Sequence, residues 1–317
     1  MIFLLIIGFI LLIKGADFIV KGATDLAKKM HISEMVIGIL IVGIGTSLPE
    51  ILITVKSAIM GKPDIVIGNG IGSSICNILL VVGIASICKP VKIDKRIIKI
   101  HFPLLIISII LLSIFCNFGG KSQITKVEAV TLILFTIGYI TYTLYEGKKE
   151  NLSNKINSNR SEENNDNVKI IRIFFSLLIG ALFLKYGADF VVDGATKIAT
   201  RLNISESIVG ITIIAIGTSL PEIITSLVAS KNKKSDLALG NVIGSNIFNI
   251  CLLPGIGGII SPINYDNGFN ISLLFLAVVI VEIIIIQKLE KKYVIERKKG
   301  IALSFIYFLY TIRMILT

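Results

Sequence analysis

Long apolar runs recur along the whole chain and constrain its fold more than any other feature. A helix needs about 20 apolar residues to cross a bilayer, and ten runs of that order occur in the 317 residues. Because 54% of the residues are hydrophobic and only 17% are charged, a soluble enzyme domain is excluded. We predict an all-α integral membrane protein with ten transmembrane helices, at about 2–27, 34–60, 64–88, 97–116, 126–146, 169–199, 205–230, 236–260, 268–287 and 300–316.

The two halves of the chain repeat one another. The hexapeptide G-T-S-L-P-E occupies 45–50 and again 217–222, a separation of 172 residues (217 minus 45). A constant separation without insertion or deletion indicates duplication of one unit. The same separation relates G-A-D-F at 15–18 to 187–190, G-A-T at 22–24 to 194–196, I-S-E at 32–34 to 204–206, G-N-x-I-G-S at 68–73 to 240–245, and Asn77 to Asn249.

A polar segment divides the chain into three predicted domains. Residues 1–146 form a first five-helix repeat and residues 169–317 a second one. Between them, 147–168 is rich in Asn, Ser, Lys and Glu and is predicted to be a flexible linker without a core. Because each repeat has an odd number of spans, the second must insert with the opposite topology. Inverted repeats are typical of secondary transporters.

The distribution of Lys and Arg supports this inversion. Basic residues concentrate in cytoplasmic loops, and placing the N-terminus outside puts most of them on the inner side. The chain is then predicted to lie in the cytoplasmic membrane with both termini outside and the linker in the cytoplasm. The net charge of +11 is scattered over short loops, which argues against a nucleic-acid partner. The outer loops hold only Lys62, Lys121, Lys126, Arg201 and Arg313.

Each G-T-S-L-P-E copy lies in the middle of an apolar run and predicts a broken helix. Pro49 and Pro221 cannot donate a backbone hydrogen bond, so neighbouring carbonyls are freed to face a cavity. A carboxylate costs at least ~2.5–3.5 kcal/mol at the bilayer centre, so two of them require a purpose. Such a site is built of oxygen and suits Na+ or Ca2+ better than copper or zinc. Its side chains are Thr46, Ser47 and Glu50 in the first copy and Thr218, Ser219 and Glu222 in the second.

The second repeated motif adds neutral oxygen ligands. Ser73 and Asn77 are four residues apart and share one helix face, as do Ser245 and Asn249. Small residues at 68, 72, 240 and 244 also allow close helix packing, which does not by itself explain the polar residues. A phosphate-binding loop is excluded because no strand precedes the motif and no Gly-Lys-Ser/Thr follows it.

Other polar residues are interpreted as structural. Asp17 and Asp189 have lysines at helical spacing, which favours local ion pairs. His101 and Glu282 have no counterpart in the repeat. The four cysteines form no C-x-x-C pair, so neither a disulfide framework nor a thiolate metal site is predicted. The apolar N-terminal run has no small-residue cleavage site and is interpreted as a first span.

The two motifs, once in each half, resemble the alpha repeats of the cation/calcium exchanger superfamily, specifically the sodium/calcium exchangers of prokaryotes. The resemblance covers both halves. It implies a compact core around the ion sites, with the first and sixth spans outside it and sliding during alternating access. It also implies that the main-chain carbonyls of Gly43 and Ala215 join the site.

Asn249 occupies a position where some relatives, including the potassium-dependent branch, carry aspartate. The central charge is then −2 from Glu50 and Glu222, which one Ca2+ or two Na+ would neutralise. Potassium dependence is disfavoured, and the sodium stoichiometry stays open.

We hypothesise a secondary antiporter that exchanges Na+ for Ca2+ through shared sites at Glu50 and Glu222. The alternative on the same fold is a calcium(cation)/proton antiporter, and a passive channel or scaffold is a more distant one. No enzyme activity, ATP use or cofactor is expected, since no nucleophile and base can be paired. The transported ions and the lipid bilayer are the expected partners, and a monomer is sufficient.

Overall fold

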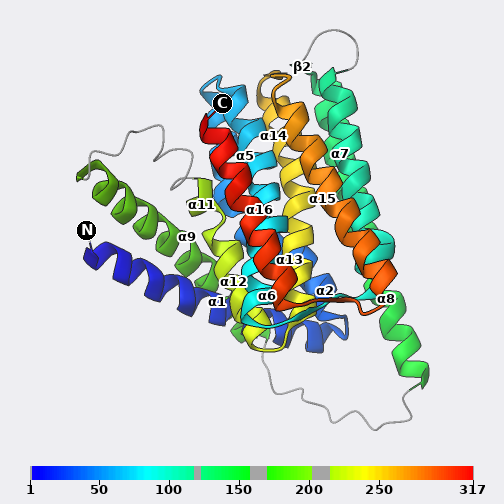
Figure 1. Cartoon of the computed structure of the whole chain (residues 1–317). Coiled ribbons are helices and arrows are strands. Elements are labelled where there is room, and N and C mark those ends of the chain that lie inside the picture. Colours follow the sequence, from blue (N-terminus) through cyan, green and yellow to red (C-terminus); the bar gives the residue numbers. More distant parts are fainter. Residues whose placement is uncertain (1, 118–122, 158–169, 202–214, 317) are drawn as a thin grey trace.

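The computed structural model describes residues 2–117, 123–157, 170–201 and 215–316, which are almost entirely helical (Figure 1). Seven helices are long and apolar enough to cross a membrane, or eight if a bent pair counts as one span. The predicted span 205–230 lies partly outside the described residues. The last helix, of 20 residues, begins with three basic residues. The all-helical membrane architecture is therefore confirmed.

The first half begins with a long helix and continues through a span made of short pieces. Its elements are α1 (Ile2–Met30), α2 (Glu34–Ile37), η1 (Gly38–Val42), α3 (Gly43–Thr46), α4 (Leu48–Ile59), α5 (Pro63–Cys76), η2 (Asn77–Val81), α6 (Val82–Cys88), β1 (Val91–Lys92), η3 (Ile97–His101), α7 (Phe102–Asn117), β2 (Gln123–Ile124) and α8 (Lys126–Asn157). The η elements are π-helical turns, which are rare and frequent at functional sites.

The second half follows the same plan. Its elements are α9 (Ile170–Arg201), α11 (Ala215–Thr218), α12 (Leu220–Lys231), α13 (Ser235–Ile247), η5 (Phe248–Leu252), α14 (Leu253–Ile260), β3 (Ile263–Asn264), α15 (Phe269–Glu290), β4 (Val294–Ile295) and α16 (Arg297–Leu316).

One boundary differs from the prediction. Helix α8 continues to Asn157, beyond residue 146 where the linker was expected to begin. The first part of the expected linker contains Glu, Lys and Leu and no proline. These residues extend an existing helix at little cost even in water. The rest of the linker, 158–168, lies outside the described residues.

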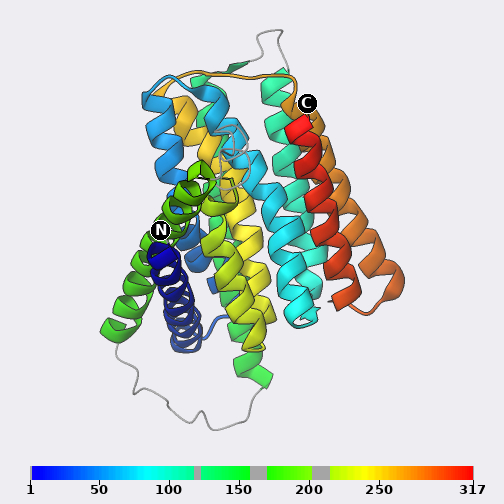
Figure 2. The same cartoon turned by 60° about the vertical axis from the view of Figure 1, so that its left-hand side comes forward.

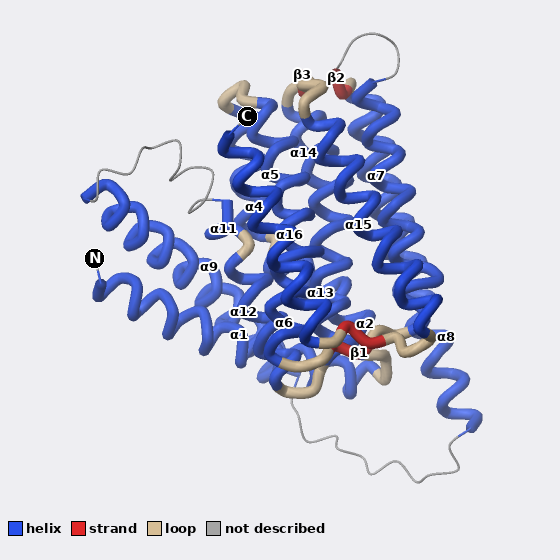
Figure 3. Tube along the Cα trace, viewed as in Figure 1, coloured by secondary structure: helices blue, strands red, loops and turns tan. Residues whose placement is uncertain are grey.

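Two short antiparallel ribbons join the halves and demonstrate the inversion. Strand β1 pairs with β4, with Val91 opposite Ile295, and β2 pairs with β3, with Ile124 opposite Ile263. Figure 3 shows β2 and β3 at one end of the molecule and β1 at the other. Strands β1 and β3 start 172 residues apart, the repeat separation, yet they lie at opposite ends. We call these the β1–β4 end and the β2–β3 end.

The core lies around the central spans of each half. About three quarters of the central windows in Ile65–Cys88 and Ser235–Ile260 is buried (78% in each), against 33% for α1 and 22% for α9. Helices α1 and α9 pack together at one side of this core (Figures 1 and 2).

Glycines make the contact between α1 and α9 unusually close. A Cβ on Gly8 would lie 2.9 Å from the carbonyl oxygen of Gly187, and a Cβ on Gly15 would lie 2.9 Å from that of Gly180. Small residues allow such backbone contact between membrane helices. The two helices therefore form one unit beside the core, as the family resemblance implied.

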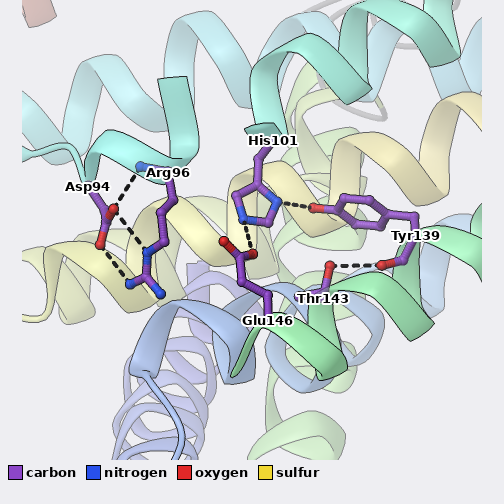
Figure 4. Close-up of polar contacts among 6 residues, drawn as sticks. All are labelled: Asp94, Arg96, His101, Tyr139, Thr143 and Glu146. Atoms are coloured by element: carbon purple, nitrogen blue, oxygen red, sulfur yellow. Dashed lines mark hydrogen bonds and ion pairs between the residues drawn. The ribbon is translucent and has the colours of Figure 1, made fainter. Parts of the chain in front are cut away.

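The residues interpreted as structural have the expected kind of contact in most cases. The His101 ring bonds the Tyr139 hydroxyl through Nδ1 at 3.0 Å, and its Nε2 lies 3.4 Å from Glu146 Oε2. Figure 4 shows how these side chains join η3 to α8. Lys185 and Asp189 form the predicted i, i+4 pair at 3.5 Å. Asp17 has no ion pair among the described residues.

Candidate ion-binding site

Both G-T-S-L-P-E copies break their helix, as predicted. In the first, the helix bends by 47° between Thr46 and Leu48, and Ser47 leaves helical geometry at φ −80°, ψ 6°. In the second, Ser219 has φ −86° and ψ 2°. Each proline is the second residue of the helix that follows, Pro49 in α4 and Pro221 in α12. There its missing N–H is no loss, so the proline starts a new helix rather than distorting an old one.

The two glutamates lie next to these breaks and are fully buried. Glu50 is in the first turn of α4 and Glu222 in the first turn of α12, and both are 0% exposed. The Ser47 hydroxyl donates to Glu222 Oε1 at 3.3 Å. The break of one half thus contacts the acid of the other, so the two motifs form a single site.

Ser245 links the same acid to the first half. Its hydroxyl lies 3.4 Å from Glu222 Oε1 and 3.3 Å from the Gly43 carbonyl oxygen, and 3.4 Å from the Thr46 hydroxyl. The Gly43 carbonyl is therefore at the site, where the family resemblance put it.

Backbone contact between the halves brings these groups together. A Cβ on Gly240 would lie 2.4 Å from the Met35 carbonyl oxygen, and one on Gly244 only 2.2 Å from that of Ile39. In this copy the glycines serve the close packing that the spacing allowed, and the same contact carries Ser245 to the site. In the first copy a Cβ on Gly72 would meet nothing within 4 Å.

The two asparagines sit in π-helical turns at matching places. Asn77 opens η2 and Asn249 is the second residue of η5, and both are 0% exposed. A wider turn leaves backbone groups out of the regular ladder, a geometry common at binding sites. Ser73, one turn before Asn77, is 4% exposed and lies near the Glu50 carboxylate.

Several of these buried oxygens lack a hydrogen-bond partner within the described part of the chain: both carboxylate oxygens of Glu50, Oε2 of Glu222, the side-chain amides of Asn77 and Asn249, and the Ser219 hydroxyl. Unpaired buried polar groups are costly. Their concentration here fits a site whose partners are hard cations, which take oxygen ligands.

Thr218 and Ala215 complete the predicted set. Thr218 ends α11 and lines two cavities described below. Ala215 is the first residue of α11, and the residues before it, 202–214, lie outside the described part. The prediction for its carbonyl remains a prediction.

The sequence analysis missed a layer of polar residues behind the site. The Thr46 hydroxyl donates to Asn241 Oδ1 at 2.9 Å, and Asn241 Nδ2 donates to the Ser226 hydroxyl at 3.1 Å. Asn69 donates to the Glu50 carbonyl oxygen at 3.3 Å. Asn69 and Asn241 are the asparagines of the repeated G-N-x-I-G-S motif, so the signal was present, but only the serines of that motif were assigned a role.

Two cavities reach Thr218. One, of about 220 Å³, lies between α5 and α16 and includes Ser73. The other, of about 420 Å³, lies between α4 and α9 and is lined by the Lys185–Asp189 pair. The first includes Phe269 and Met314, at the start of α15 and near the end of α16, so it lies toward the β2–β3 end.

The donor set indicates which ions the site can bind. Among the described residues no group of three or more His, Cys, Asp or Glu could hold a metal ion. Two carboxylates with hydroxyl, amide and carbonyl oxygens suit Na+ and Ca2+, whereas copper and zinc prefer sulfur and nitrogen.

The fold and the site together define an integral membrane protein with a buried cation-binding centre shared by two inverted halves. The family model described as sodium/calcium exchanger protein matches residues 1–145 and 172–316. The chain belongs to that family.

Relatives agree over almost the full length. The chain is 36% identical over 304 residues to an uncharacterised membrane protein of Methanocaldococcus jannaschii, covering 95% of this chain and 94% of the relative. It is 31% identical over 336 residues to the sodium/calcium exchanger MaX1 of Methanosarcina acetivorans, covering 96% and 95%.

A solved structure agrees as well. The sodium-calcium exchanger NCX_Mj, soaked with zero Na+ and Ca2+, superposes with a TM-score of 0.82 at 32% identity, covering 99% of this chain and 98% of that one. A second structure of the same exchanger, soaked with 10 mM Na+ and zero Ca2+, gives a TM-score of 0.81 at 34% identity over 97% and 96%.

Proposed function

We propose that this protein is a secondary antiporter that exchanges Na+ for Ca2+ across the cytoplasmic membrane. The observation that carries the proposal is the contact of Ser47 and Ser245 with Glu222, which joins the broken helices of both halves around two buried carboxylates. Family membership and the sodium/calcium exchangers among the relatives support the choice of ions.

The chemistry of exchange follows from charge. Two carboxylates buried away from water attract cations until their charge is neutralised. One Ca2+ or two Na+ would neutralise them, and a third monovalent ion would leave a net charge of +1. Na+ and Ca2+ compete because they use the same oxygens. A loaded, neutral centre crosses between the two access states more readily than a charged one.

The proposed ion ligands are the following: the side chains of Glu50, Glu222, Thr46, Ser47, Thr218, Ser219, Ser73, Asn77, Ser245 and Asn249, and the carbonyls of Gly43 and Ala215. Asn69, Asn241 and Ser226 are positioning residues that hold the broken helices and Thr46. One chain contributes both halves of the site, which supports a monomer as the transporting unit.

The orientation is proposed from the basic loops. With the N- and C-termini outside and the linker in the cytoplasm, the β2–β3 end faces outward and the β1–β4 end faces the cytoplasm. The two cavities toward the β2–β3 end then correspond to a state open to the outside. Transport needs neither ATP nor a resident cofactor, because the Na+ gradient supplies the energy.

The test is uptake of radioactive calcium into proteoliposomes loaded with Na+ and diluted into Na+-free buffer. K+-loaded vesicles and a Glu50→Gln, Glu222→Gln double variant are the controls. Uptake that requires internal Na+ and both glutamates supports exchange. Uptake driven equally well by a proton gradient without Na+ would overturn it.

A further inference from the structure

An ion pair joins the two halves at the β1–β4 end. Lys234 Nζ contacts Glu34 Oε1 directly, and the two side chains are only 31% and 24% exposed. Glu34 is the first residue of α2, whereas Lys234 is the residue before α13. The pair therefore connects elements that are distant in sequence and belong to different repeats.

Both partners begin segments that lead directly to the ion site. From Glu34 the chain runs through α2, η1 and α3 to Thr46 and the break at Ser47. From Lys234 it runs along α13 to Ser245. When the pair holds these two starting points together, it also holds the packing of α13 against the first broken span.

A second contact between the halves closes the same end. The Ser230 hydroxyl, near the end of α12, donates to the carbonyl oxygens of Ala85 and Lys89 at 3.0 and 3.3 Å. These carbonyls lie at the end of α6. The described contacts thus tie the halves together at the β1–β4 end, while the 220 Å³ cavity lies toward the other end.

The turn before α13 is not built for its own stability. Lys234 places a positive charge at a helix N-terminus, where a cation is unfavourable. Lys233 has φ +65°, a left-handed conformation that costs a side-chain-bearing residue about 1–2 kcal/mol. The matching turn of the first half has Gly61 at φ +66°, which adopts it freely. Contact with Glu34 offsets the unfavourable charge.

We propose that the Glu34–Lys234 pair is a latch between the repeats: it forms when the site is open toward the β2–β3 end and breaks when the site opens toward the β1–β4 end. The proposal rests on the proposed exchange function, because only a transporter with two access states needs such a contact. It names the residues that bias one state over the other.

The inverted repeat supplies a matched residue on the opposite end. Lys62 precedes α5 as Lys234 precedes α13, at the repeat separation of 172. Lys62 has no ion pair among the described residues. The sequence carries Glu206 at the position matching Glu34, outside the described part. Inverted repeats exchange conformations between the two states, so neutralising Lys62 should not favour opening of the β1–β4 end.

The experiment compares Glu34→Gln, Lys234→Gln and the charge swap Glu34→Lys, Lys234→Glu in full-length protein reconstituted with known orientation. The apparent Ca2+ affinity is measured separately on each face by radioactive calcium exchange. An ion pair of this exposure is worth a few-fold in population. Each single variant should strengthen apparent affinity at the β1–β4 face and weaken it at the β2–β3 face by about 2- to 5-fold, and the swap should restore the wild-type ratio.

Two further variants keep the test specific. Lys292→Gln breaks an exposed i, i+4 pair with Glu296 at the same end but within one half, and should leave the ratio of affinities unchanged. Lys62→Gln should leave it unchanged or shift it the opposite way. Hydrogen exchange of residues 34–47 should increase in Glu34→Gln and not in Lys292→Gln.

A purely structural pair gives a different result. Equal affinities on both faces in the single variants, with only a lowered melting temperature, would overturn the latch, as would a swap that fails to restore the ratio. If wild-type vesicles show no Na+-driven Ca2+ uptake, it is the proposed function that fails, and the hydrogen-exchange comparison still tests the contact.

Discussion

The two glutamates occupy identical motifs but have different surroundings. Glu222 accepts hydrogen bonds from Ser47 and Ser245 through one oxygen, whereas neither oxygen of Glu50 has such a partner among the described residues. The difference cannot come from the motif, which is the same in both halves. It comes from the conformation, because inverted halves face opposite ends and a state open to one end treats them unequally. A symmetric sequence thus yields an asymmetric site in any single state.

The largest effect is expected from removing either charge. Glu50→Gln or Glu222→Gln leaves one carboxylate to balance Ca2+, and losing one partner of a buried charge pair costs about 3–5 kcal/mol. Na+-driven Ca2+ uptake should fall more than ~100-fold in each. Melting temperature and vesicle incorporation should stay near wild type. Substantial exchange in either variant would show that the two acids are not one centre.

Replacing the matched serines sharpens the comparison. Ser47→Ala removes an ion ligand and also a hydrogen bond to a carboxylate, which is worth about 1.5–3 kcal/mol. Ser219→Ala removes a hydroxyl that has no described partner, at about 0.5–1.5 kcal/mol. Equilibrium Ca2+ binding should weaken about tenfold or more in the first and only several-fold in the second. Equal losses would mean that the observed asymmetry has no energetic weight.

A smaller change is expected from adding charge at Asn249. Asn249→Asp raises the central charge from −2 to −3, so a third Na+ becomes a neutralising ligand rather than an excess charge. The ratio of Na+ to Ca2+ fluxes, measured with both isotopes in the same vesicles, should rise by about one Na+ per Ca2+. Asn77→Asp, the counterpart in the other half, provides the matched comparison. An unchanged ratio in both variants would contradict the charge argument.

The smallest effect concerns a carboxylate that already has a permanent partner. Burial alone would raise the pKa of Asp94, but hydrogen bonds and charge from Arg96, including a contact of 2.7 Å, hold it below its ordinary value of 3.8. A lowered folded pKa stabilises the protein above the unfolded pKa, and this stabilisation is lost as the pH falls through the folded value. Thermal unfolding from pH 6 to 3 should show a loss of about 0.5–1 kcal/mol that is absent in Asp94→Asn.

Much of this architecture could be predicted from the sequence because the informative residues are chemically extreme. Proline, glycine and an acid inside an apolar run leave few structures possible, and a constant repeat separation carries each assignment to the other half. The broken helices, the buried glutamates and the role of Ser245 followed from such patterns. The contact of Ser47 with Glu222 did not, because it depends on which access state the halves adopt.

Other features depended on packing that no local pattern reveals. The π-helical turns at Asn77 and Asn249 arise where the helix must shift register against its neighbours, and the residues in them read as ordinary helix. Asn69 and Asn241 lie in a repeated motif, but their roles depend on which backbone group lies opposite. The end of α8 was misplaced because a polar sequence extends a helix in water as readily as it forms a loop.

The two ribbons have a mechanical consequence. Because β1 is bonded to β4 and β2 to β3, the halves are stitched together at both ends of the molecule. Two rigid halves that rock about a central pivot must separate at one end while they close at the other, and each separation would tear a ribbon. Access must therefore alternate by shear: the glycine-sealed pair of α1 and α9 and the broken spans glide along a core that never comes apart.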